Sequence, residues 1–334
     1  MREREHDNRP GSGAISRRVW IAGTLAAGLA GPKLTRGDDP PAAAAEEAKE
    51  EQAVKELGRS LGLNPFRTSR SDHYLGIGDS TSTFLALNLR DLEGLAADYF
   101  VHYRRKGFEI AMPGCRLTVV ILVDDRAFMA YVTRKNLREI PRNTGATLLH
   151  GVYERKTNRL ALFDHRSLGP QFSPRARFDN IQTVSHEGTH QLTFNTGLLR
   201  RDGDVPRCIV EGLAMYGEDR PFDVRSEPGR LSHVRLRDLI ASQRQKISWI
   251  PLDRLLAEDG LKVPLLLFYA QSWLLVDYLM KESTRLPAFR AYLEAIRGRN
   301  DKKSRLEDAK THLGDLGRLD EDLHAHYRRL AAQG

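Results

Sequence analysis

The sequence predicts an α+β fold in which a small mixed or antiparallel sheet in the N-terminal half packs on a helical C-terminal half. Two observations lead to this class. Strand-like runs occur only before about residue 175 and include Leu117–Asp125, a continuous apolar run rich in β-branched residues. Beyond that point apolar residues recur at helical spacing as far as the C-terminus. We therefore divide the chain into residues 1–45, 46–175 and 176–334.

Residues 1–45 carry the features of a bacterial export signal followed by a linker. The twin arginines Arg17 and Arg18 precede VWIAGTLAAGLAG, a mostly apolar stretch too short to span a membrane comfortably. This order is typical of twin-arginine signals. We expect an exported protein, periplasmic or extracellular, without a membrane span in its mature form. The alternatives are a short N-terminal anchor and a fortuitous apolar helix, and the cleavage site stays open.

Residues 46–175 are expected to form the β-containing subdomain. It begins with a helix around Glu46–Leu61, and apolar spacing predicts a second helix over Leu89–Gly107. GIGDST at Gly76–Thr81 matches neither glycine-rich phosphate-binding pattern, which indicates the end of a strand and a turn. The predicted strands are His73–Gly78, Leu117–Asp125, Phe128–Val132 and Arg159–Phe163, with Gly151–Asp164 forming a hairpin that turns at Lys156–Asn158.

Residues 176–334 are expected to be helical and to carry the functional site. Their final stretch, from residue 285 onward, is rich in Arg, Asp and Leu at helical spacing, which indicates a layer of packing helices. The predicted helices are Asn180–Phe194, Pro206–Glu218, Leu236–Gln243, Leu252–Glu258, Val263–Lys281, Pro287–Arg297 and Leu319–Ala332.

Composition excludes some classes of protein. The formal net charge of +8 is scattered, without a long Lys/Arg run or a nucleic-acid-binding motif, so it indicates a basic surface and no nucleic-acid partner. The two cysteines, Cys115 and Cys208, could pair after export or stay free thiols. Because no Cys-x-x-Cys pair occurs, a thiolate zinc finger is excluded.

The stretch SHEGTHQ at residues 185–191 contains the first candidate site residues. His186 and His190 are four apart and therefore lie on one face of the predicted helix. Both imidazoles can reach one zinc ion from there. Glu187 is rotated away from them but lies beside the metal, where a general base takes a proton from the attacking water.

A third ligand is expected on the next predicted helix. Glu211 stands among the apolar residues of VPRCIVEGLAMYGE at 205–218. A carboxylate in such surroundings needs a partner, because burying it unpaired is costly. A metal ion would be that partner, and the intervening loop, Thr196–Val205, is long enough to bring the second helix back to the first.

His-Glu-Gly-Thr-His at 186–190, with Glu-Gly-Leu-Ala-Met-Tyr at 211–216, resembles the gluzincin metallopeptidases, in particular aminopeptidase N-like enzymes and small exported bacterial families. The resemblance covers roughly residues 178–280. It implies a zincin-like fold and one Zn²⁺ per chain, bound by His186, His190 and Glu211, with Glu187 as the base in hydrolysis of a peptide or protein. It also implies that Tyr269, in YAQSW at 269–273, donates its hydroxyl to the oxyanion.

The sequence departs from these families at two places. The aminopeptidase Gly-x-Met-Glu-Asn-type signature is absent, and only GVYERK at 151–156 offers an edge strand for an extended substrate. Met215 stands where thermolysin-like relatives often have an aspartate, so another group must orient the histidine. The alternative function is a non-catalytic envelope or binding protein with a structural zinc. Substrate sequence, endo- or exopeptidase action and oligomeric state stay open.

Overall fold

The computed structural model describes residues 41–141, 149–171, 173–218 and 234–333. These residues belong to one compact unit, 36–334. The predicted export signal lies almost entirely within residues 1–40, outside the described residues. The expected subdomain boundary at residues 175 and 176 falls inside a helix, α4 (Ser173–Asn195).

A five-stranded mixed sheet forms the centre of the N-terminal half, and the fold is α+β as expected. Its order is β1-β2-β3-β5-β4; the three central strands are parallel to one another, and each edge strand is antiparallel to its neighbour. The predicted strand regions and the hairpin are confirmed, with the exception of Phe128–Val132, and β1 was not predicted. The strands are β1 (Arg67–Arg70), β2 (Tyr74–Gly78), β3 (Leu117–Leu122), β4 (Gly151–Glu154) and β5 (Arg159–Phe163).

The prediction of a strand at Phe128–Val132 is wrong, because this segment lies in the helix α3 (Asp125–Thr133). The carboxylate of Asp124 caps that helix by accepting a hydrogen bond from the backbone N–H of Ala127. Its buried side chains, Ala127, Phe128, Ala130 and Tyr131, recur at helical spacing. A short apolar segment fits either period, and here the cap decides for the helix.

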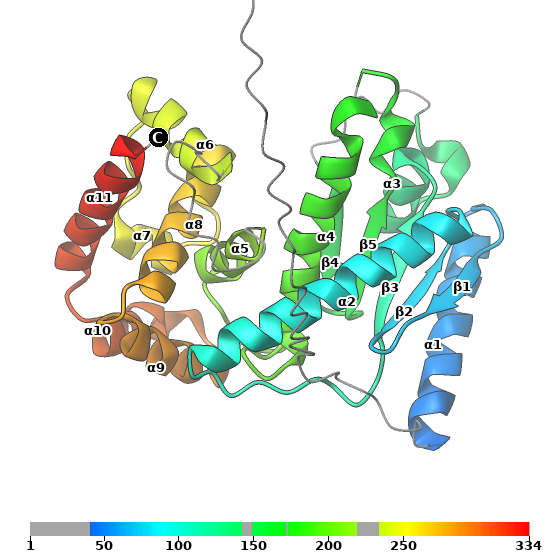
Figure 1. Ribbon diagram of the computed structural model, residues 1–334, viewed down its shortest axis with the longest axis horizontal. Coiled ribbons are helices and arrows are strands. Elements are labelled where there is room, and N and C mark those ends of the chain that lie inside the picture. Colours follow the sequence, from blue (N-terminus) through cyan, green and yellow to red (C-terminus); the bar gives the residue numbers. More distant parts are fainter. Residues whose placement is uncertain (1–40, 142–148, 172, 219–233, 334) are drawn as a thin grey trace, which may run out of the picture. The chain divides into compact units, whose positions relative to one another are not determined.

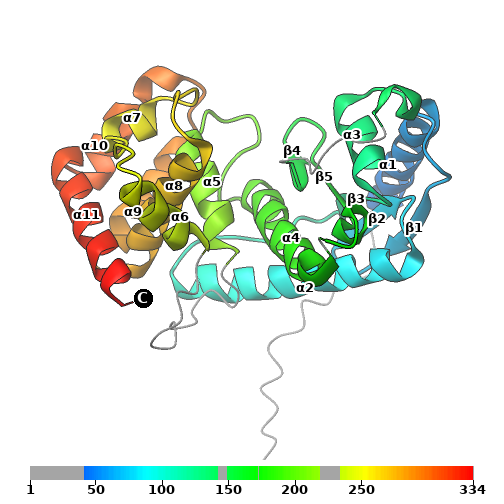
Figure 2. The ribbon, with the colours of Figure 1, turned by 90° about the horizontal axis from the view of Figure 1, so that it is seen from above.

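Helices cover both faces of the sheet, whereas the sequence predicted a helical layer on one side. Figure 2 shows α1 (Pro41–Ser60) and α3 on one side and α2 (Ser82–Arg105) and α4 on the other. Along β3, Val120 and Leu122 join the core formed with α1 and α3. On β2, Gly76 lies against Leu89 of α2, on the opposite face. Of the predicted helical half, α4 is the helix that packs on the strands, and it carries both histidines of the motif.

The helices that follow α4 form the second part of this unit (Figure 1). Here α5 packs between α4 and α8, and α2 reaches this part as well, since the hydroxyl of Tyr216 on α5 lies 3.0 Å from Nε2 of His102. Among the described residues, no helix combines the length and the apolar character needed to cross a bilayer. The predicted helices are confirmed with shifted ends, and α10 was missed: α5 (Arg207–Tyr216), α6 (Val234–Arg244), α7 (Leu252–Ala257), α8 (Leu265–Lys281), α9 (Leu286–Arg297), α10 (Arg305–Leu313) and α11 (Leu316–Ala332).

Candidate metal centre

The two histidines project from α4 toward Glu211 on α5, because residues four apart share one helix face. Small residues between them pack against other helices. A Cβ on Gly188 would lie 2.6 Å from Leu95 of α2. Thr189 is fully buried, and a Cβ on Gly217, just after α5, would lie 2.1 Å from its hydroxyl oxygen. The motif therefore contains small residues where α2 and the end of α5 approach α4 most closely.

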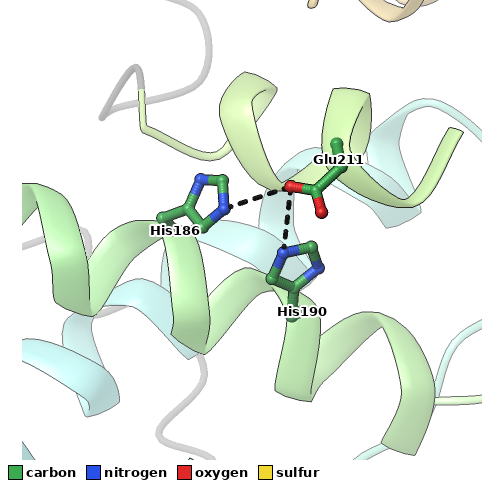
Figure 3. A group of neighbouring side chains, drawn as sticks. All are labelled: His186, His190 and Glu211. Atoms are coloured by element: carbon green, nitrogen blue, oxygen red, sulfur yellow. Dashed lines mark ion pairs between the residues drawn. The ribbon is translucent and has the colours of Figure 1, made fainter. Parts of the chain in front are cut away.

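Glu211 reaches the same point from the facing helix. Its Oε2 lies 3.5 Å from Nε2 of His186 and 3.6 Å from Nε2 of His190, as the dashed lines in Figure 3 indicate. In the described part of the chain, this is the one group of three or more His, Cys, Asp or Glu side chains whose ligand atoms all lie within 4.8 Å of one another. Ligand atoms about 2.0–2.2 Å from a tetrahedral zinc are about 3.4 Å apart, and the two distances from Oε2 of Glu211 are close to this separation.

The position of Glu211 depends on how α5 is anchored. Arg305, whose side chain is 3% exposed, pairs with Asp204 before α5 and with Asp259 after α7, each at 2.7 Å. Asp259 also accepts a hydrogen bond from the backbone N–H of Arg207, the first residue of α5. Next to the ligand, Gly212 lies so close to α8 that a Cβ would be 2.5 Å from the carbonyl oxygen of Ser272.

Opposite charges within the cluster shift the pKa values of its side chains. Burial alone would lower the pKa of His186, but hydrogen bonds to Glu211 and Glu218 raise it to about 10. Burial alone would raise the pKa of Glu211, but His186 and His190 hold it well below its ordinary value. The carboxylates thus hold a proton on the imidazole of His186 at neutral pH. A bound dication would take the place of that positive charge.

Glu218 is a candidate functional residue that the sequence did not reveal. Its Oε1 lies 2.7 Å from Nδ1 of His186 and accepts a hydrogen bond of 2.8 Å from Arg235, while Gln182 donates to its other oxygen. Its side chain is only 4% exposed. The hydrogen bond at Nδ1 leaves Nε2 to face Glu211, as a metal ligand requires. The sequence offered one indication of Glu218, namely its spacing, because residue 218 lies about two helical turns after Glu211.

The Glu218 carboxylate contacts His186 from the side where an orienting group was expected. The position four residues after Glu211 is Met215, which is fully buried in the core. Glu218, seven residues after Glu211, supplies the carboxylate in its place.

Glu187 lies between the ligands and the edge of the sheet. Its side chain is almost buried, and Oε2 accepts a hydrogen bond of 2.7 Å from the backbone N–H of Tyr153 on β4. Strand and helix approach closely because Gly151 has no side chain; a Cβ there would lie 2.6 Å from Thr183 and 3.0 Å from Glu187. The candidate base is thereby held at one oxygen, next to the edge strand.

Tyr269 lies on α8, half-buried, in the electrostatic field of the cluster. Burial and the negative charge of Glu211 raise the pKa of its hydroxyl, Arg207 acts in the opposite direction, and Glu187 adds a smaller upward effect. The phenol is therefore protonated at neutral pH and can act as a donor. The tertiary structure thus brings all five predicted site residues into one region.

The other histidines that the structure describes and both cysteines lie outside this cluster. The ring of His324 lies 4.0 Å from that of Trp249 between centroids, tilted by 30°, and Nε2 of His326 pairs with Asp277 at 3.0 Å. Both cysteines are free thiols: Cys115 is exposed and Cys208 is buried, so no disulfide joins them.

A family described as "protein of unknown function (DUF1570)" matches residues 180–300. This segment contains His186, Glu187, His190, Glu211 and Tyr269, and it also contains Glu218. No curated protein matches the chain. Fold and site together define an α+β protein with a candidate metal centre, and its candidate ligands and Glu187 lie in the segment that the family shares.

Proposed function

We propose that the protein is an exported zinc-dependent peptidase with a zincin-like fold, of the gluzincin type. The observation that carries this proposal is one carboxylate oxygen of Glu211 at nearly equal distance from two imidazole nitrogens, with a further buried acid, Glu187, beside them. Nitrogen and oxygen donors in this number and spacing suit zinc, and three protein ligands leave a position for water or substrate.

His186, His190 and Glu211 would bind the ion. When bound, zinc supplies Lewis-acid chemistry, which acidifies water and polarises a carbonyl group. Glu187 takes the proton from the attacking water and returns it to the leaving amine. Tyr269 donates a hydrogen bond to the carbonyl oxygen as that atom gains negative charge. Glu218 keeps His186 in the tautomer and orientation that ligation needs.

The substrate class is a peptide or protein that binds in extended form. β4 is the edge strand of the sheet, and Tyr153 on it holds Glu187. An extended peptide can add to such an edge through main-chain hydrogen bonds. This places the scissile bond next to the base, with the metal ligands on the other side of Glu187.

The second candidate is a non-catalytic exported protein with a structural zinc. Both functions need the metal, so metal content alone does not separate them. Structural zinc sites use four protein ligands, whereas this cluster offers three in the described residues. The presence of the acid Glu187 at the cluster favours the enzyme.

The test uses purified full-length protein. We expect about one zinc per chain by elemental analysis and cleavage of a mixed-peptide digest that a chelator stops. Glu187→Gln should abolish cleavage with zinc still bound, and Glu211→Ala should lose the metal. Glu258→Gln, at an exposed carboxylate outside the site, is the matched control. Full cleavage by Glu187→Gln would exclude the assigned base, and unchanged zinc in Glu211→Ala would exclude the third ligand.

A further inference from the structure

Arg207 stands beside the candidate metal centre, on the helix that carries Glu211. It is the first residue of α5, one turn before Glu211, and Nε lies 3.9 Å from Oε1 of Glu211. The imidazoles face the other oxygen, Oε2. The side chain of Arg207 is 42% exposed, so its guanidinium borders both the cluster and solvent.

Neighbouring groups fix the guanidinium in this position. Its Cζ lies 5.0 Å from the ring centroid of Phe268 on α8, a cation–π contact. It also interacts with the hydroxyl of Tyr269. The backbone N–H of Arg207 is held by Asp259. Arg207 and Tyr269 therefore present donors to the same side of the site, from two different helices.

Among the described residues, Glu211 is the carboxylate that pairs with the Arg207 side chain, whose Nη1 also donates to the backbone oxygen of Asp259 at 3.5 Å. The carboxylate of Asp259 nearby is already paired with Arg305 and Lys302. In the metal-bound state, Glu211 shares its negative charge with the ion. The guanidinium then becomes available to a second carboxylate, which it can bind in a bidentate manner.

We propose that Arg207 determines specificity by binding a carboxylate of the substrate close to the scissile bond. This inference rests on the proposed peptidase function. The carboxylate is either the C-terminus of the peptide or an acidic side chain, since the two share the same chemistry. Leu265 and Leu266, exposed at the first turn of α8, offer apolar contacts to the adjoining residues.

The probes are dye-labelled hexapeptides of leucine and alanine. One form ends in a free carboxylate, one in an amide, and a third set is amidated with a single Glu at each position in turn. Fluorescence anisotropy measures their dissociation constants with zinc-loaded Glu187→Gln protein, which binds without cleaving. A carboxylate form should bind about 10- to 100-fold more tightly than the plain amide, as charged hydrogen bonds suggest.

Two substitutions in that background test the residue. Arg207→Gln should reduce the ratio of carboxylate to amide affinity to about twofold or less, and Arg207→Lys, which keeps the charge but not the planar fork, should leave an intermediate ratio. Arg254→Gln, at an exposed arginine paired with Glu258, is the control and should leave the ratio unchanged. Zinc affinity and circular dichroism are measured for every variant.

The outcomes separate the two proposals. An unchanged ratio in Arg207→Gln, or no carboxylate preference in the parent, overturns the role of Arg207. A change in zinc affinity with an unchanged ratio also overturns it, because Arg207 would then only support Glu211. If unsubstituted protein cleaves none of the peptides while the Arg207-dependent ratio is observed, the carboxylate site stands and the peptidase function fails.

Discussion

Glu218→Gln tests whether a buried carboxylate orients the metal ligand. The substitution keeps the shape of the side chain and an oxygen acceptor but removes the negative charge 2.7 Å from Nδ1 of His186. Loss of such an outer partner commonly costs about 10- to 100-fold in metal affinity, which is about 1.4–2.7 kcal/mol. We expect zinc affinity to fall within this range.

The same change should also lower stability. Glu218 is 4% exposed and pairs with Arg235 at 2.8 Å, and removing one partner of a buried pair costs up to about 3–5 kcal/mol. Asp238, which lies 3.6 Å from Arg235, keeps part of the compensation, so we expect a loss below that limit. The loss of stability and the loss of zinc affinity are separate quantities and need separate measurements.

Zinc affinity is measured by competition with a chromophoric chelator, and the free energy of unfolding by urea titration of metal-free protein. Glu258→Gln is the matched control, because that carboxylate is 47% exposed and pairs with Arg254 on the surface. It should leave both quantities unchanged, because an exposed ion pair contributes little. Zinc affinity of Glu218→Gln within twofold of the unsubstituted value would refute the orienting role.

Three further predictions follow from the surroundings of the site. Gly212→Ala should lower the free energy of unfolding by about 1–3 kcal/mol, because its Cβ would lie 2.5 Å from the backbone oxygen of Ser272. Gly260→Ala is the control and should leave that free energy unchanged, because nothing lies within 4 Å of its Cβ; equal denaturation midpoints for the two variants would contradict the packing argument. Burial lowers the pKa of His102 to about 3, so between about pH 6.5 and 3 the unfolded chain binds a proton that the folded chain does not, and the free energy of unfolding should fall as pH falls. In urea titrations from pH 7 to 5, His102→Gln should therefore lose about 2 kcal/mol less stability than the unsubstituted protein. Because the pKa of His186 is raised to about 10, zinc binding at pH 7 should release about one proton. The heat of binding measured by calorimetry should then depend on the ionisation enthalpy of the buffer, and a heat that does not depend on the buffer would contradict proton release.

The sequence by itself determined the parts of the site that depend on local spacing. His186 and His190 share a helix face because they are four residues apart, and the apolar neighbours of Glu211 marked it as an acid in need of a partner. The helices of the second half and the hairpin 151–164 were predictable for the same reason, since a repeat of 3.6 or 2 residues is written in consecutive positions.

Only the tertiary structure decided which distant groups meet. Glu218, Arg235 and Arg207 are ordinary charged residues in the sequence. Their contacts arise because α5 packs between α4 and α8, and α6 packs on α8. Coverage of both sheet faces likewise depends on packing between segments far apart in the chain. Side-chain partners across elements follow from three-dimensional closeness, which no local period encodes.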